Sequence, residues 1–194
     1  MKLTTNMSKP TLFLLENVSD VTLLYKVERM NIQKRKLPQP MLPRGFAGRI
    51  TAWFMEKGHK SIYENVSKVL DLQPEDDLVE VACGSGHFLK KYVSHVHSVA
   101  GLDLSELMVK RAIKKNKARV ATGTAEFVHG EASRLPWEDN RFSIAITMDS
   151  IIAFPQPLES LKEMCRVLRP GGRVVVSIEH NAENGLGHTK KVKQ

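Results

Sequence analysis

The stretch Glu80-Val81-Ala82-Cys83-Gly84-Ser85-Gly86 joins an apolar run at residues 78–82 to a predicted helical segment at residues 87–96. Glycine at 84 and 86 lets the backbone turn sharply and come close to a ligand. The helix that follows presents free N–H groups and the positive end of its dipole to that turn. We therefore expect a site for a nucleotide-like or carboxylate-bearing ligand, although a turn with two glycines also occurs as a plain connection.

Around this turn, short apolar runs alternate with helical segments. The predicted strands are residues 78–82, 98–102, 125–129, 143–148 and 173–178. Strands that alternate with helices in this way predict an α/β domain with a mainly parallel sheet. Only 16 residues follow Ile178, and they are rich in Gly, Asn and Lys. We therefore divide the chain into a basic leader and linker at residues 1–45, a folded domain at 46–180 and a basic tail at 181–194.

The composition is that of one domain with a sizeable core, since the 194 residues are 42% hydrophobic and 26% charged. The net charge of +8 is concentrated at the ends: residues 1–60 carry +7, residues 61–189 carry −2 and the last five carry +3. Two cysteines cannot build a disulfide framework, which favours the reducing cytoplasm. No stretch has the roughly 18 consecutive apolar residues of a membrane-spanning helix, so we expect no membrane span.

A second candidate site residue follows the next predicted strand. Residues 101–105 read GLDLS, which puts Asp103 at the carboxyl end of the strand beside the glycine turn, 17 residues after Gly86. A carboxylate in this place can accept hydrogen bonds from both hydroxyls of a ribose. We expect Ser105 to cap the following helix, which leaves Asp103 for the ligand. The alternative is that Asp103 itself caps that helix.

Four segments carry a resemblance to a known family: VEVACGSGHF, GLDLSELM, FVHGEASRLPWEDNRFS and EMCRVLRPGGRVVVSIE. In order and spacing they resemble the S-adenosylmethionine-dependent methyltransferases of the seven-strand, Rossmann-like class, over residues 65–180. The resemblance is closest to the small-molecule branch that includes quinone and sterol methyltransferases. It implies an α/β three-layer sandwich, S-adenosyl-L-methionine as the cofactor and methyl transfer to a small-molecule acceptor.

The resemblance also implies cofactor contacts at particular positions of this chain. Two cysteines are too few for a four-ligand zinc site, so we expect no metal site. Around the methionine part of the cofactor it places Glu80, Ala82, Gly84 and Gly86. At the ribose it places Asp103, and around the adenine it places Leu104, Met108, Glu131 and Ala132.

Several departures from the family pattern bear on these expectations. Ala82 replaces the first glycine of the usual triplet, which is acceptable if its backbone is not left-handed. Glu131 stands where the family usually has Asp, so an ordinary surface glutamate is the alternative there, and Ser143 replaces a common acidic residue. The family sheet ends with an antiparallel hairpin of sixth and seventh strands, for which the residues after 178 are too few. We therefore expect an unpaired sheet edge at residues 173–178, self-association through it and little turnover.

Methyl transfer from a sulfonium depends mainly on holding the nucleophile in line with the methyl group at short distance. A base helps when the acceptor is a phenol, an amine or an acidic carbon. The candidates are His59, Tyr63, His87 and Asp149. Our choice for the catalytic residue is Asp149, because it lies at the carboxyl end of the fourth predicted strand.

Three different functions share part of this pattern. A nicotinamide-dependent dehydrogenase would share the strand at residues 78–82, the glycine turn and Asp103. Its motif also requires a third glycine, at the position where this chain has Leu89. The pattern is also compatible with a non-catalytic or truncated relative that only binds, and with an RNA-associated methyltransferase that uses the basic leader. We interpret the basic run at residues 110–119 as a solvated helix face, which disfavours nucleic acid as the partner.

Overall fold

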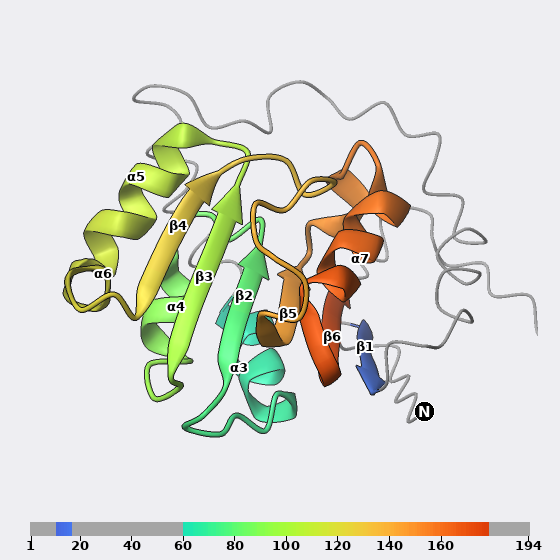
Figure 1. Ribbon diagram of the computed structural model, residues 1–194, viewed down its shortest axis with the longest axis horizontal. Coiled ribbons are helices and arrows are strands. Elements are labelled where there is room, and N and C mark those ends of the chain that lie inside the picture. The colour runs from blue at the N-terminus through green and yellow to red at the C-terminus, as the bar shows by residue number, and fades with distance from the viewer. Residues whose placement is uncertain (1–10, 17–59, 179–194) are drawn as a thin grey trace, which may run out of the picture.

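The computed structural model describes residues 11–16 and 60–178, which form a layered α/β domain (Figure 1). The expectations for His59, for most of the leader and for the tail lie outside these residues. The strands are β1 (Thr11–Glu16), β2 (Asp77–Val81), β3 (Ser98–Asp103), β4 (Ala125–His129), β5 (Phe142–Met148) and β6 (Leu168–Ile178). The helices are α3 (Lys60–Val69), α4 (His87–Lys91), α5 (Glu106–Lys115), α6 (Lys117–Ala121), the 3-10 turn η3 (Ile151–Ala153) and α7 (Pro157–Arg166).

The sheet has the order β1-β6-β5-β2-β3-β4, and all neighbouring strands from β6 to β4 run parallel. These five strands are the five that the sequence predicts, although β6 begins at Leu168 rather than at 173. Parallel strands are covered on both faces, which explains why their sequences are nearly continuous apolar runs. The predicted α/β sandwich with a mainly parallel sheet is therefore confirmed.

Two apolar clusters lie on opposite faces of the sheet and give the domain its three layers. On one face, Leu78 of β2 packs with Ile62 of α3 and Phe88 of α4. On the other face, Val79 of β2 packs with Leu161 of α7. Figure 1 shows α7 on the near side of the sheet, with α3 and α4 behind it. The alternation of adjacent β2 residues between the two clusters follows from the two-residue period of a strand.

One expectation about the edge of the sheet is wrong. Residues 173–178 are not unpaired, because β1 lies antiparallel to them along its whole length, from the pair Thr11↔Ile178 to the pair Glu16↔Arg173. The expectation of an open edge rested on the few residues after 178, with cover by the N-terminal segment or the tail as its alternative, and an antiparallel neighbour can come from either end of a chain. With the backbone groups of β6 paired, the self-association and low turnover that were expected from an open edge lose their basis.

Removing β1 should restore the open edge. We expect a variant that lacks residues 1–16 to show dimers or larger species in size-exclusion chromatography, since an apolar, β-branched edge strand pairs with other chains. A variant that lacks only residues 1–10 keeps β1 and is the matched control, which should elute as the full chain does. Identical elution of all three chains would contradict the role assigned to β1.

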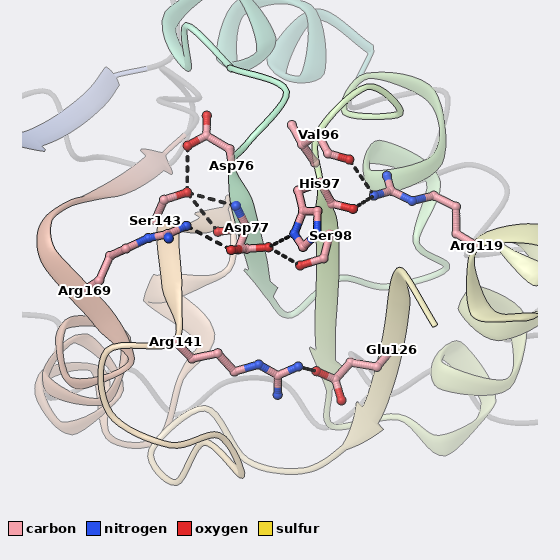
Figure 2. Close-up of polar contacts among 10 residues, drawn as sticks. All are labelled: Asp76, Asp77, Val96, His97, Ser98, Arg119, Glu126, Arg141, Ser143 and Arg169. Carbon is pink, nitrogen blue, oxygen red and sulfur yellow. Dashed lines mark hydrogen bonds and ion pairs between the residues drawn. The ribbon is translucent and has the colours of Figure 1, made fainter. Parts of the chain in front are cut away.

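At the amino ends of the strands, a polar cluster joins loops that are distant in sequence (Figure 2). Asp77 accepts hydrogen bonds from Ser98 Oγ at 2.5 Å and from Arg169 at 2.9 Å, and its Oδ1 lies 2.7 Å from His97 Nδ1. Burial raises the pKa of Asp77, but the hydrogen bonds from Ser98 and His97 and the nearby positive charges outweigh it, and the net pKa is lowered. Ser143, the departure from the family's acidic residue, accepts from the Asp77 N–H at 3.0 Å in this cluster. Its position at the amino edge keeps this substitution away from the carboxyl ends of the strands.

Candidate active site

The candidate site lies where β2 and β3 end side by side. The two strands pair in parallel up to Val81↔Leu102, and the N–H of Cys83 continues the contact by donating to the Leu102 carbonyl at 3.0 Å. Residues 82–86, which we call the glycine loop, therefore lie next to the carboxyl end of β3. Figure 1 shows the arrowheads of β2 and β3 pointing toward the same edge. Ligands of open parallel sheets bind at this edge.

The Asp103 carboxylate connects the glycine loop to the start of α5. Its Oδ2 accepts a hydrogen bond from the Gly84 N–H at 2.8 Å, and its Oδ1 accepts one from the Ser105 N–H at 2.8 Å. Ser105 stands at the N-cap position of α5, but no hydrogen bond from its side chain caps the helix, so the expectation that Ser105 does the capping is wrong. Each carboxylate oxygen has two lone pairs, so both backbone bonds leave acceptor capacity for a ligand.

Electrostatics around Asp103 are set by a second carboxyl group. Burial raises the pKa of Asp103, and the hydrogen bonds from Ser105 and Gly84, together with the charge of His129, only partly offset this rise. Glu80, at the end of β2, is 3% exposed. Its pKa lies well above the ordinary value, first because of burial and second because of the negative charge of Asp103. Two neighbouring carboxyl groups, one buried and one half-buried, do not ionise together easily, so a cationic group bound beside them would stabilise their charged forms.

Glu80 also leaves one oxygen unused. Among the described residues no hydrogen-bond partner reaches its buried Oε2. An unpaired buried oxygen costs about 1–3 kcal/mol, and a ligand that brings a donor would recover that energy. The orphaned oxygen beside Asp103 therefore fits a ligand with hydroxyl or ammonium donors, as S-adenosylmethionine has.

The two glycines of the loop have different roles. Gly84 has φ +52°, and a Cβ built on it would meet no atom within 4 Å, so it borders open space. Gly86 has φ +66°, and a Cβ there would lie 2.8 Å from Asn116 Nδ2 and 3.0 Å from the Ala112 Cβ. Gly84 thus leaves room beside the loop for a ligand, whereas Gly86 is required by the close packing of α5.

Ala82 does not meet the condition under which it was acceptable. Its φ is +64°, in the left-handed region, so the expectation of an ordinary backbone at this position is wrong. The left-handed conformation costs an L-residue about 1–2 kcal/mol, because Cβ approaches the following carbonyl oxygen. The turn needs that conformation whichever residue occupies it, and alanine bears the strain that glycine would avoid.

Replacing Ala82 with glycine should therefore stabilise the protein. We expect Ala82→Gly to raise the free energy of unfolding by about 0.5–1 kcal/mol, the relief of the left-handed strain less the greater entropy loss of glycine. Urea denaturation measures this change. The same substitution at Ala145, which is buried in the regular strand β5, should lower the free energy of unfolding instead. A loss of stability at both positions would contradict the strain at Ala82.

The ends of β3 and β4 form one rim of the site. Leu104 is 45% exposed although it is large and apolar, while Met108 is buried. His129 Nε2 lies 3.0 Å from the Leu104 carbonyl oxygen, so this histidine, which the sequence did not single out, ties β4 to the rim. Glu131 is exposed and Ala132 is half-buried, directly after β4. Contact of these residues with an adenine ring stays a prediction.

The base candidates fall into two groups. Asp149 follows β5, and its N–H donates to the Ser177 carbonyl of β6 at 2.8 Å. With φ +53° it is held in a left-handed conformation, which is rare outside glycine and recurs at functional sites. Tyr63 of α3 and His87, the first residue of α4 and the one that directly follows the glycine loop, lie together with ring centroids 5.9 Å apart. The strand β2 separates β5 from β3, so Asp149 and Asp103 lie on opposite sides of the glycine loop.

Neither cysteine has the environment of a nucleophile. Cys83, in the glycine loop, is buried, and burial with the negative charges of Glu80 and Asp103 holds its pKa well above the ordinary value. Burial also raises the pKa of Cys165 in α7. A thiol is reactive only as the thiolate, which a raised pKa disfavours. Within residues 11–16 and 60–178 there is also no cluster of three or more possible metal ligands, and no helix that is long and apolar enough to cross a membrane.

Comparison with protein families gives a match at the same segments. Residues 79–176 match the family described as methyltransferase domain. The demethylmenaquinone methyltransferase of Shouchella clausii is 36% identical over 121 residues, which cover 60% of this chain and 51% of that protein. The demethylmenaquinone methyltransferase of Staphylococcus saprophyticus is 34% identical over 120 residues, which cover 60% of this chain and 50% of that protein. The chain thus spans about half the length of these curated relatives.

Solved structures agree on the fold. A putative methyltransferase from Bacillus halodurans is 26% identical, with a TM-score of 0.53 over 62% of this chain and 53% of that one. A methyltransferase from Aquifex aeolicus that depends on S-adenosylmethionine has a TM-score of 0.55 over 64% of this chain and 71% of that one. At 22% identity, the second likeness supports the fold alone.

Proposed function

Because this chain belongs to the methyltransferase-domain family, whose model matches residues 79–176, we propose that it transfers a methyl group from S-adenosylmethionine to a small-molecule acceptor. The observation that carries the proposal is the Asp103 carboxylate, which holds the Gly84 N–H at 2.8 Å at the ligand-binding edge of the sheet. A plain connection between a strand and a helix would not need a buried glutamate and a half-buried aspartate beside it. The proposed setting is the reducing cytoplasm, which suits two unpaired thiols.

The described residues fit the proposed cofactor. Asp103 would accept from the ribose hydroxyls, the glycine loop would border the methionine part, and Leu104 would cover the adenine with its exposed side chain. When bound, S-adenosylmethionine supplies an electrophilic methyl group and a neutral leaving group. The chain's part is to hold the acceptor in line with that methyl group and to exclude water, which can supply most of the acceleration.

A quinol-type ring is the acceptor class that we propose. It rests on the relatives named as demethylmenaquinone methyltransferases, which match about half of their length to this chain. Methylation of such a ring removes a proton from the acceptor, and we assign Asp149 to accept it. The raised pKa of Cys83 and Cys165 argues against cytosine C5 methylation, which needs a cysteine nucleophile.

Two measurements test the proposal in order. Calorimetric titration of the full chain with S-adenosylmethionine, S-adenosylhomocysteine and NAD should detect binding of the first two and not of NAD. Failure to bind either sulfur compound overturns the proposed function, and binding of NAD supports a dehydrogenase. Transfer of a labelled methyl group to a reduced, short-chain demethylnaphthoquinone then tests the acceptor class. Binding without transfer to any quinol would favour a protein that only binds the cofactor.

A further inference from the structure

The carboxyl end of α5 contacts the glycine loop through two side chains that the sequence does not single out as site residues. Asn116 Nδ2 donates to the Gly86 carbonyl at 3.1 Å and to the Ala112 carbonyl of α5 at 2.9 Å. Lys115 Nζ donates to Ser85 Oγ at 2.9 Å. The two side chains therefore donate to consecutive residues of the glycine loop.

Asn116 is built into this contact and is not a surface residue. It is 4% exposed, and burial of a primary amide is costly unless its polar atoms have partners. Its Nδ2 has two carbonyl partners, while among the described residues its Oδ1 has none. The space between it and the loop is also closed, since a Cβ on Gly86 would come within 2.8 Å of Asn116 Nδ2. The asparagine thus fixes the Gly86 carbonyl at the point where the loop enters α4.

The last residue of β3 binds the same loop. Asp103, two residues before Ser105, accepts the Gly84 N–H, while Lys115 and Asn116 hold the next two loop residues. One strand–helix unit, β3 with α5, therefore holds three consecutive residues of the glycine loop. A loop that is hydrogen-bonded at three consecutive residues has fewer conformations open to it before the ligand arrives, which reduces the entropy that binding costs.

We propose that Asn116 and Lys115 are positioning residues, which act on the cofactor by fixing the conformation of the glycine loop. The inference rests on the proposed function, because it takes the ligand of this loop to be S-adenosylmethionine or its product. Neither side chain needs to touch the ligand. Their effect should appear in cofactor affinity beyond any general loss of stability.

Arg119 of α6 provides a matched control. It donates to the carbonyls of Val93 at 3.1 Å, Val96 at 2.9 Å and His97 at 3.2 Å, in the connection that follows α4, and Figure 2 shows its contact with that connection. Asn116 and Arg119 thus make the same kind of bond, from a side chain to backbone carbonyls, at the two ends of the short helix α4. Of these two side chains, only Asn116 donates to a carbonyl of the glycine loop.

The experiment measures the dissociation constant of S-adenosylhomocysteine by calorimetry and the unfolding temperature of each variant. Asn116→Ala should weaken binding about tenfold and Lys115→Met about threefold, the scale of one lost hydrogen bond. Lys115→Arg keeps a donor for Ser85 Oγ and should restore affinity to within about twofold of the unmodified chain. Arg119→Met should lower the unfolding temperature at least as much as Asn116→Ala, with affinity unchanged within about twofold.

The outcomes separate this inference from the proposed function. An unmodified chain that does not bind S-adenosylhomocysteine overturns the proposed function and the inference with it. Binding by the unmodified chain together with unchanged affinity in Asn116→Ala and Lys115→Met overturns the inference alone. A loss of affinity in Arg119→Met that matches the loss in Asn116→Ala also overturns it, since both then act through stability. If Asn116→Ala does not fold, the Lys115 variants decide, because that lysine is only half-buried.

Discussion

Gly84→Val is expected to remove measurable S-adenosylmethionine binding while the domain stays folded. The branched side chain would project into the open space beside the glycine loop, where a Cβ meets no protein atom within 4 Å and where we place the methionine part of the cofactor. At φ +52° the valine also adds backbone strain of about 1–2 kcal/mol. Because the free energy of unfolding of a typical domain is about 5–15 kcal/mol, the variant should stay folded. We expect affinity to fall by at least about a hundredfold, since the ligand would have to displace the new side chain. Calorimetry and circular dichroism on the same sample measure both effects.

Gly123→Val is the matched control for this prediction. Gly123 has φ +73°, and a Cβ on it also meets no atom within 4 Å, but it lies in the turn before β4 at the amino end of the sheet. The two variants should lose similar amounts of stability, and only the change at position 84 should affect binding. Unchanged affinity in Gly84→Val would remove the cofactor from this side of the loop.

Asp103→Ala should weaken cofactor binding by about 10- to 150-fold, which corresponds to about 1.5–3 kcal/mol for a lost hydrogen bond to a charged group. It should also lower the free energy of unfolding, because the Gly84 and Ser105 N–H groups lose their acceptor. The two effects are measured separately, by calorimetry with S-adenosylmethionine and by urea denaturation.

Asp77→Ala serves as the control for Asp103→Ala. It removes a hydrogen-bonded carboxylate of the same size from the amino end of β2, away from the candidate site. It should therefore lower stability without a change in affinity. If Asp103→Ala behaves like Asp77→Ala, the Asp103 carboxylate only supports the turn before α5, and its assignment to the ribose is wrong.

The part of the fold that the sequence predicts is the part that local patterns determine. The runs that became β2, β3, β4 and β5 are apolar and bounded by turn residues, and the glycine loop follows β2 as expected. The place of β1 depends instead on a partner at the other end of the described chain, and no local pattern in residues 11–16 reports that pairing. Sequence patterns give the identity of strands more readily than their neighbours.

The candidate site was predictable to a similar extent. Glu80 and Asp103 stand at the ends of adjacent parallel strands, so their proximity follows from the topology. The left-handed backbone of Ala82 could not be read from the residue, because alanine normally avoids that conformation. No sequence pattern indicated a role for Asn116 either. Its contact with Gly86 spans 30 positions and forms only when α5 packs on the loop.

The pairing of β1 with β6 also has a consequence for how the protein is made. A ribosome produces chains from the amino end, so β1 is synthesised early and its partner β6 is the last described strand to appear. Until then β1 has no partner in the sheet, and the strands from β2 onward can pair only with one another. Closure of the sheet is therefore a late step that joins distant parts of the chain, and such long-range pairing is slow. During that interval β1 is an apolar strand without a partner, and such a strand can pair with other chains.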